Sequence, residues 1–134
     1  MIFKCKINNT HQFTSFTIPY LCRMNWKTIT DENQLDTIIE QSYHQPQVLF
    51  KHSTRCSISS LAKSRLDSHE AHADIAFHYL DLLTYRPLSN KIAQLFDVAH
   101  ESPQVLLIRN GKCIYDESHN GIIFKDIIHQ ASKN

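Results

Sequence analysis

Cys56 is the residue in this chain whose surroundings best suit chemistry. It follows a short apolar run (48–50) and precedes an amphipathic pattern typical of a helix. A helix N-terminus presents unpaired N–H groups and about half a positive charge, which together stabilise a thiolate over a thiol. Lys51, His52 and Arg55 lie in the same segment and add positive potential. We therefore expect Cys56 to be an exposed nucleophile rather than an inert buried thiol.

Ser59 stands three residues after Cys56, where a dithiol redox motif carries its second cysteine. With a serine there, the site cannot close its own disulfide, so a second thiol from solution must release whatever Cys56 has bound. The Ser59 hydroxyl can still donate a hydrogen bond to the thiolate. Thr54 and Arg55 belong to the polar segment before Cys56, and the Arg55 charge could steer an anionic thiol toward the site.

The second feature that could do chemistry is Ser102–Pro103, directly before an apolar strand pattern (104–108). An X-Pro bond adopts the cis form at low cost. A cis bond would leave the backbone of Ser102 free to pair with an extended substrate, as in β-strand addition. Sequence alone does not fix the isomer, because an ordinary trans proline can also begin a strand. We nevertheless expect Pro103 to be cis and to face Cys56, because the loop before this strand and the loop after the strand at 48–50 can meet at one edge of the sheet.

The elements that must position these residues alternate between helices and strands. Asp31 begins the first helix pattern, with Thr30 as its expected N-cap, and Gln45–Pro46 ends it. Strands are predicted at 48–50, 73–80, 104–108 and 112–116, and Asn110–Gly111 is a hairpin turn between the last two. Each helix pattern has an expected inward face. In the first two helices it consists of Leu35, Ile38, Ile39 and Ser42, and of Ile58, Leu61, Ala62, Arg65 and Leu66. In the third helix, which Ser89 is expected to cap, it consists of Ile92, Ala93, Leu95 and Phe96, and in the last helix (122–129) of Ile123, Ile127 and Ile128.

This order of elements predicts an α/β fold with a mixed central sheet and helices on both faces, which is the thioredoxin plan. The strand–helix–strand unit requires parallel pairing with a right-handed crossover, and the terminal hairpin is antiparallel. Residues 24–134 are expected to form this one domain. Residues 1–23 have no clear period and no acidic residue, so we expect them to be an unstructured extension or an artefact of start-site choice.

Composition excludes several other classes of protein. The 134 residues carry 14 Lys+Arg and 13 Asp+Glu, a net charge of +1, which argues against binding to nucleic acid mainly by charge. The longest apolar runs, such as Val105–Ile108, are too short to span a bilayer. The four cysteines, at 5, 22, 56 and 113, form no CxxC or CxxH pair, so neither a metal site nor a disulfide framework is expected, and the default compartment is the reducing cytosol.

Several segments together resemble one known family. They are Phe50–Cys56 with Ile58–Ser59, Arg86–Pro87 with Ser89–Asn90, Glu101–Gln104, and Ser118–His119. The family is YtxJ, the monothiol bacilliredoxins of the bacillithiol system, which are thioredoxin-like proteins of low-GC Gram-positive bacteria. The resemblance covers residues 24 to about 131 and has one departure, Ser57, where the family often has proline. This departure leaves the nucleophile in place.

The resemblance implies that the protein removes bacillithiol from S-bacillithiolated proteins, with Cys56 as the nucleophile. Bacillithiol would be the thiol co-substrate, a free thiol or a partner reductase would regenerate the enzyme, and no tightly bound cofactor or metal is implied. The predicted substrate-binding residues are Thr54, Arg55, Ser59, Ser102 and Pro103. The alternatives are a glutaredoxin-like or general thiol reductase that uses another small thiol, and a non-catalytic redox-sensing module.

Four other residues with reactive or titratable side chains are interpreted as structural or surface residues. Cys113 could be a distant resolving thiol, but a half-buried strand residue is the favoured interpretation. His69 and His72 lack the spacing of a zinc-binding HExxH motif, so a solvated surface is expected. We expect His119 to make a structural hydrogen bond.

Overall fold

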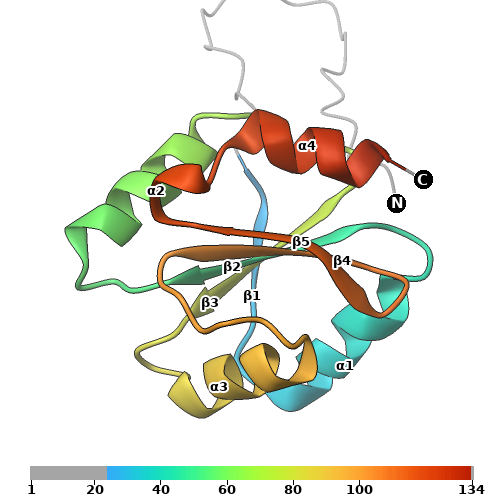
Figure 1. Cartoon of the computed structure of the whole chain (residues 1–134), viewed down its shortest axis with the longest axis horizontal. Helices are drawn as coiled ribbons and strands as arrows, with labels where there is room; N and C mark the ends of the chain where they lie inside the picture. The colour runs from blue at the N-terminus through green and yellow to red at the C-terminus, as the bar shows by residue number, and fades with distance from the viewer. Residues whose placement is uncertain (1–23, 134) are drawn as a thin grey trace, which may run out of the picture.

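The structure, a computed structural model, describes residues 24–133. The expectation for residues 1–23 lies outside this range. Five strands form one sheet, flanked by four α-helices and a short 3-10 helix (Figure 1). In chain order the elements are β1 (Trp26–Thr28), α1 (Glu32–Gln41), β2 (Gln47–His52), α2 (Ser57–Asp67), β3 (Ala76–Asp81), α3 (Arg86–Leu95), β4 (Gln104–Arg109), β5 (Lys112–Ser118), η1 (His119–Gly121) and α4 (Phe124–Ser132).

The sheet has the strand order β1-β3-β2-β4-β5. β2 pairs in parallel with β3 on one side and antiparallel with β4 on the other, and β5 continues antiparallel to β4. Helices α2 and α4 cover one face of the sheet, and α1 and α3 cover the other (Figure 1). This arrangement confirms the predicted α/β fold with a mixed sheet, the parallel strand–helix–strand unit and the antiparallel hairpin.

The core has two halves, one on each face of the sheet. Successive strand residues point to opposite faces, so β2 contributes Phe50 to the half under α2 and α4, and Leu49 to the half under α1 and α3. Both side chains are fully buried. Because β2 is covered on both sides, it is buried along its whole length, and its C-terminal end leads directly to Cys56.

Strand β1 was not predicted, because three residues are too few to show a period of two. Trp26 lies in it and is half-buried, with its ring centroid 5.6 Å from that of Phe50. The indole Nε1 donates to Asp67 Oδ1 at 2.6 Å. Trp26 thus links β1, at the edge of the sheet, to the C-terminal end of α2 through a hydrogen bond.

Two predicted helix caps are wrong. The N-cap of α1 is Asp31 and not Thr30: the Asp31 carboxylate accepts the Gln34 N–H at 2.9 Å, and the Gln34 side chain reaches back in a capping box. Ser89 does not cap α3, which begins at Arg86 with Pro87 in its first turn. Proline suits that position because its fixed φ is already helical and its missing N–H would have no partner there.

The predicted inward face of α2 is correct for Ala62 and Leu66. The other predicted members, including Arg65, are exposed. The buried residues of α2 are Ser59, Ala62 and Leu66, whereas Ile58 and Leu61 are 52% and 59% exposed. Apolar spacing alone favours the other phase, but Ser59 finds buried hydrogen-bond partners and so turns this face inward.

The remaining differences lie at the ends of elements. Leu95 at the end of α3 and Ile123, the N-cap of α4, are exposed rather than inward-facing. β3 begins at Ala76 rather than at residue 73. The hairpin is confirmed: Asn110 and Gly111 both have positive φ, 51° and 74°, as a type I′ turn requires.

Candidate active site

Cys56 is the N-cap of α2, as the sequence predicts for a nucleophile at a helix start. Its backbone is extended (φ −106°, ψ 121°), its N–H donates to Ser53 O at 3.2 Å, and its carbonyl accepts the Ser60 N–H at 3.0 Å. The side chain is half-buried. Within residues 24–133, its Sγ forms no capping hydrogen bond, and the first turn of α2 holds no acidic residue. The local field at Cys56 is therefore that of an uncompensated helix N-terminus.

Ser59 lies in the first turn of α2, with its side chain fully buried. Its Oγ accepts the Ser53 N–H at 2.9 Å and hydrogen-bonds with His52 Nδ1 at 2.6 Å. Across the described part of the chain, Ser59 makes no hydrogen bond to Cys56 Sγ, so the expected bond to the nucleophile is not formed. Ser59 instead ties the loop before Cys56 to the helix after it.

His52 does not contribute the positive charge that the sequence led us to expect. Its ring is buried and stacks on Phe50 at a centroid distance of 5.7 Å. Burial, with a smaller contribution from the Lys63 charge, lowers the pKa of His52 below its usual 6.5. The imidazole is therefore neutral at pH 7, and its role is to hold Ser59.

Lys51 is not the charge at the protein surface beside Cys56 that the sequence led us to expect. It is fully buried on the α1/α3 side of the sheet, where its Nζ lies 2.9 Å from His100 Nδ1 and 3.2 Å from Gln104 Oε1. Burial lowers the pKa of Lys51 to about 8. Of the three basic residues predicted near Cys56, only Arg55 is exposed, as is its neighbour Thr54.

The Ser102–Pro103 bond is cis, which confirms that expectation. Pro103 is buried and directly precedes β4, and Gln104 pairs with Lys51 in the ladder between β4 and β2. The proline loop, residues 99–103, therefore lies at the end of the sheet where β2 finishes and the chain continues to Cys56. In the part of the chain that the structure describes, Ser102 Oγ is the buried side-chain polar atom without a hydrogen-bond partner.

The short helix η1 contacts α2 and borders the proline loop. The His119 N–H donates to Pro103 O at 3.1 Å, and His119 Nε2 lies 4.0 Å from Glu101 Oε2. A backbone hydrogen bond thus supports the structural interpretation of His119. Three segments converge at this edge of the sheet: the start of α2 with Cys56, the proline loop, and η1.

Cys113 has the properties of a structural thiol. It is half-buried and packs against the α1/α3 half of the core. Burial raises the pKa of the Cys113 thiol to about 11, so almost none of it is thiolate at pH 7. His69 and His72 are exposed, as interpreted, and the His69 ring stacks on Phe124 with a centroid distance of 4.3 Å.

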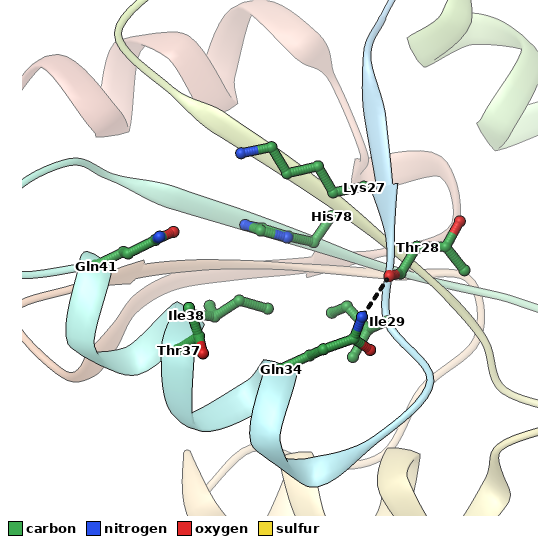
Figure 2. A pocket seen from close by; sticks show the side chains of 8 residues that line it. All are labelled: Lys27, Thr28, Ile29, Gln34, Thr37, Ile38, Gln41 and His78. Carbon is green, nitrogen blue, oxygen red and sulfur yellow. Dashed lines mark hydrogen bonds between the residues drawn. The ribbon is translucent and has the colours of Figure 1, made fainter. Parts of the chain in front are cut away.

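A separate hollow of about 200 Å³ lies between β1 and α1 (Figure 2). Lys27 and the buried His78 line it on the sheet side, and Gln34, Thr37 and Gln41 line it on the helix side (Figure 2). Burial lowers the pKa of His78 to about 4, so this imidazole is neutral. None of the predicted site residues lines the hollow, so it is distinct from the Cys56 site.

Among residues 24–133, no helix is both long and apolar enough to cross a membrane. In comparisons with solved structures, a candidate oxidoreductase with a thioredoxin fold is 27% identical, with a TM-score of 0.69 over 77% of this chain and 90% of that one. Thioredoxin Mala s 13 of Malassezia sympodialis is 12% identical, with a TM-score of 0.68 over 92% of this chain and 100% of that one. Thioredoxin NaTrxh of Nicotiana alata is 16% identical, with a TM-score of 0.65 over 82% and 96%.

These structures share the thioredoxin fold, in agreement with the sheet and helix arrangement described above. The family model described as monothiol bacilliredoxin BrxC matches residues 27–127, which include Cys56, the proline loop and η1. This match confirms the resemblance found in the sequence. The chain belongs to the monothiol bacilliredoxin family of thioredoxin-like thiol oxidoreductases.

Proposed function

We propose that this protein removes bacillithiol from S-bacillithiolated proteins, with Cys56 as its nucleophile. The observation that carries the proposal is the position of Cys56, a half-exposed N-cap of α2 with Ser59 in the place of a second thiol. The family assignment supports bacillithiol as the thiol that is transferred. A site with one reactive sulfur suits exchange with a mixed disulfide, because it forms no internal disulfide with a neighbouring cysteine.

In the first step, the Cys56 thiolate attacks the bacillithiol sulfur of the mixed disulfide. The disulfide bond to the substrate protein breaks, that protein leaves as a thiolate and takes up a proton, and a new disulfide joins Cys56 to bacillithiol. In the second step, a thiolate of free bacillithiol or of a recycling reductase attacks this new disulfide and releases Cys56 as a thiolate. Each step exchanges one S–S bond for another, so neither needs a bound cofactor or a metal.

Four further residues are proposed to bind the substrate. Thr54 and Arg55 are exposed beside Cys56, and the permanent charge of Arg55 would attract an anionic thiol. The Ser102 backbone, before the cis Pro103, is available to pair with an extended segment of the substrate protein. The unpartnered Ser102 Oγ would gain a hydrogen bond when the substrate docks. Ser59 is buried and is proposed to act through the loop rather than by contact.

The test is a turnover assay in which the same substrate protein carries either bacillithiol or glutathione as its mixed disulfide. We expect faster release of bacillithiol, and no release by C56S. The matched control is C113S, which should keep the activity because its thiol is almost entirely protonated at pH 7. The expected site of reaction is the reducing cytosol.

Four outcomes would contradict parts of the proposal. Equal rates with both disulfides would indicate a general thiol reductase, and faster release of glutathione would indicate a glutaredoxin-like enzyme. Modification of Cys56 without turnover would indicate a redox-sensing module. Loss of activity in C113S, with an unchanged fold, would make Cys113 a resolving thiol.

A further inference from the structure

Lys51 is a fully buried lysine whose hydrogen-bond partners among residues 24–133 are an imidazole and an amide rather than a carboxylate. It is the penultimate residue of β2 and lies five residues before Cys56. An ammonium group can only donate hydrogen bonds, so His100 Nδ1, at 2.9 Å, must accept, and the other ring nitrogen carries the hydrogen. Gln104 Oε1 accepts the second bond, at 3.2 Å. Glu101 contributes a favourable charge from the same loop without forming a contact.

One hydrogen-bond partner, His100, belongs to the proline loop. The other, Gln104, is the first residue of β4 and directly follows the loop. Gln104 extends the connection, because its Nε2 donates to Ala99 O at 2.9 Å and its Oε1 accepts the Glu101 N–H at 3.4 Å. On the other side of the loop, Pro103 O accepts the His119 N–H. Lys51 therefore holds the loop from inside the fold, and η1 holds it from outside.

Burial of a charged amine disfavours folding unless its contacts compensate, and an apolar residue of similar length would fill the same space. A methionine there could not form these two bonds to the loop. The strand that carries Lys51 also leads to the nucleophile, so Lys51 links the position of the loop to that of Cys56. We propose that Lys51 is a positioning residue that sets the proline loop relative to Cys56 and so determines how tightly a protein disulfide docks.

This inference rests on the proposed function for its kinetic test, so the first measurement is one that needs no substrate. In K51M, the Glu101 and Gln104 amides should lose protection from hydrogen exchange, while the amides of α1 and β1 keep theirs. The matched control is K27M, which removes the exposed lysine of β1 beside the hollow in Figure 2 and should leave the loop unchanged.

The kinetic measurement separates docking from chemistry. With a bacillithiolated protein as substrate, K51M should raise KM by about tenfold, the effect of one lost charge-assisted hydrogen bond. Both kcat and the rate at which iodoacetamide alkylates Cys56 should stay within about twofold of wild type, since the nucleophile is untouched. H100A should likewise raise KM while leaving kcat and the alkylation rate of Cys56 nearly unchanged. The KM of the K51M/H100A double variant should be no higher than that of the poorer single variant, because both substitutions remove the same contact.

Three results would overturn the inference: unchanged loop exchange in K51M, a KM effect that adds to that of H100A, or a loss of Cys56 alkylation in proportion to turnover. If K51M does not fold, H100A alone decides, because His100 is exposed and its loss removes the loop half of the same contact. If the wild-type protein does not turn over the bacillithiolated substrate, the proposed function fails, and the exchange measurement still decides the role of Lys51.

Discussion

Replacement of Lys51 by methionine should stabilise the protein at pH 7 and remove a specific pH dependence. Burial lowers the pKa of Lys51 from 10.5 to about 8, so the charged amine is less stable in the folded state than in the unfolded chain. At about 1.4 kcal/mol for each pKa unit, this difference corresponds to about 3 kcal/mol of folding free energy. K51M should recover much of this, because methionine has a similar length and no charge to bury.

The sign of the pH dependence follows from the direction of the pKa change. Between about pH 8 and 10.5 the unfolded chain holds a proton on Lys51 that the folded chain has lost, so the free energy of unfolding rises with pH. K51M has no such contribution. The stability advantage of K51M over wild type should therefore shrink by about 2–3 kcal/mol between pH 7 and pH 10.

Urea denaturation of both proteins at several pH values measures this difference. The groups that face Lys51 are His100 and Glu101 of the proline loop, Gln104 of β4 and Ser89 of α3, which lies 3.5 Å from His100 Nδ1. The titratable groups away from Lys51 are common to both proteins, so their contributions to the difference cancel. A constant stability difference from pH 7 to pH 10 would refute the reasoning, as would a K51M protein that is less stable than wild type throughout.

Three further predictions concern the helix start and the loop. S59A should lower the free energy of unfolding by about 1–3 kcal/mol in urea, because it leaves the buried His52 ring and Ser53 N–H without their partner; an unchanged midpoint would contradict the assigned network. I58S should change stability by less than about 0.5 kcal/mol, while L66A should cost about 2–5 kcal/mol, and comparable losses would restore the predicted face of α2. S102A should leave the melting temperature unchanged or higher, since its hydroxyl has no partner among the described residues, yet raise KM for a bacillithiolated protein; unchanged KM would exclude Ser102 Oγ from docking.

The sequence predicted the fold well where apolar periodicity and turn chemistry are strong. The Asn110–Gly111 turn, the buried strands β2 and β4 and the helix after Cys56 follow from local patterns, and their order sets the mixed sheet. β1 escaped prediction because a three-residue edge strand has no measurable period. Its place depends instead on parallel pairing with β3, about fifty residues away along the chain.

Lys51 was misassigned because its burial depends on partners far away along the chain. Lys51 is buried because His100 and Gln104, separated from it by 49 and 53 residues, accept its hydrogen bonds. Charge alone predicts a solvated lysine, and no local pattern reveals these acceptors. The signal available in the sequence was the position of Lys51 itself, a charge directly after the apolar run Val48–Phe50.

These departures from periodicity are concentrated around the nucleophile. Lys51 and His52 end the strand that leads to Cys56, and Ser59 lies in the first turn of the helix that follows. The partners of Lys51 lie in the proline loop, and those of Ser59 are His52 and the loop before Cys56. Local patterns fail where a structure is held in place for function rather than for packing alone. The buried polar contacts on either side of Cys56 therefore serve to position its thiol and the loop opposite it, and the stability recovered in K51M should come with weaker docking.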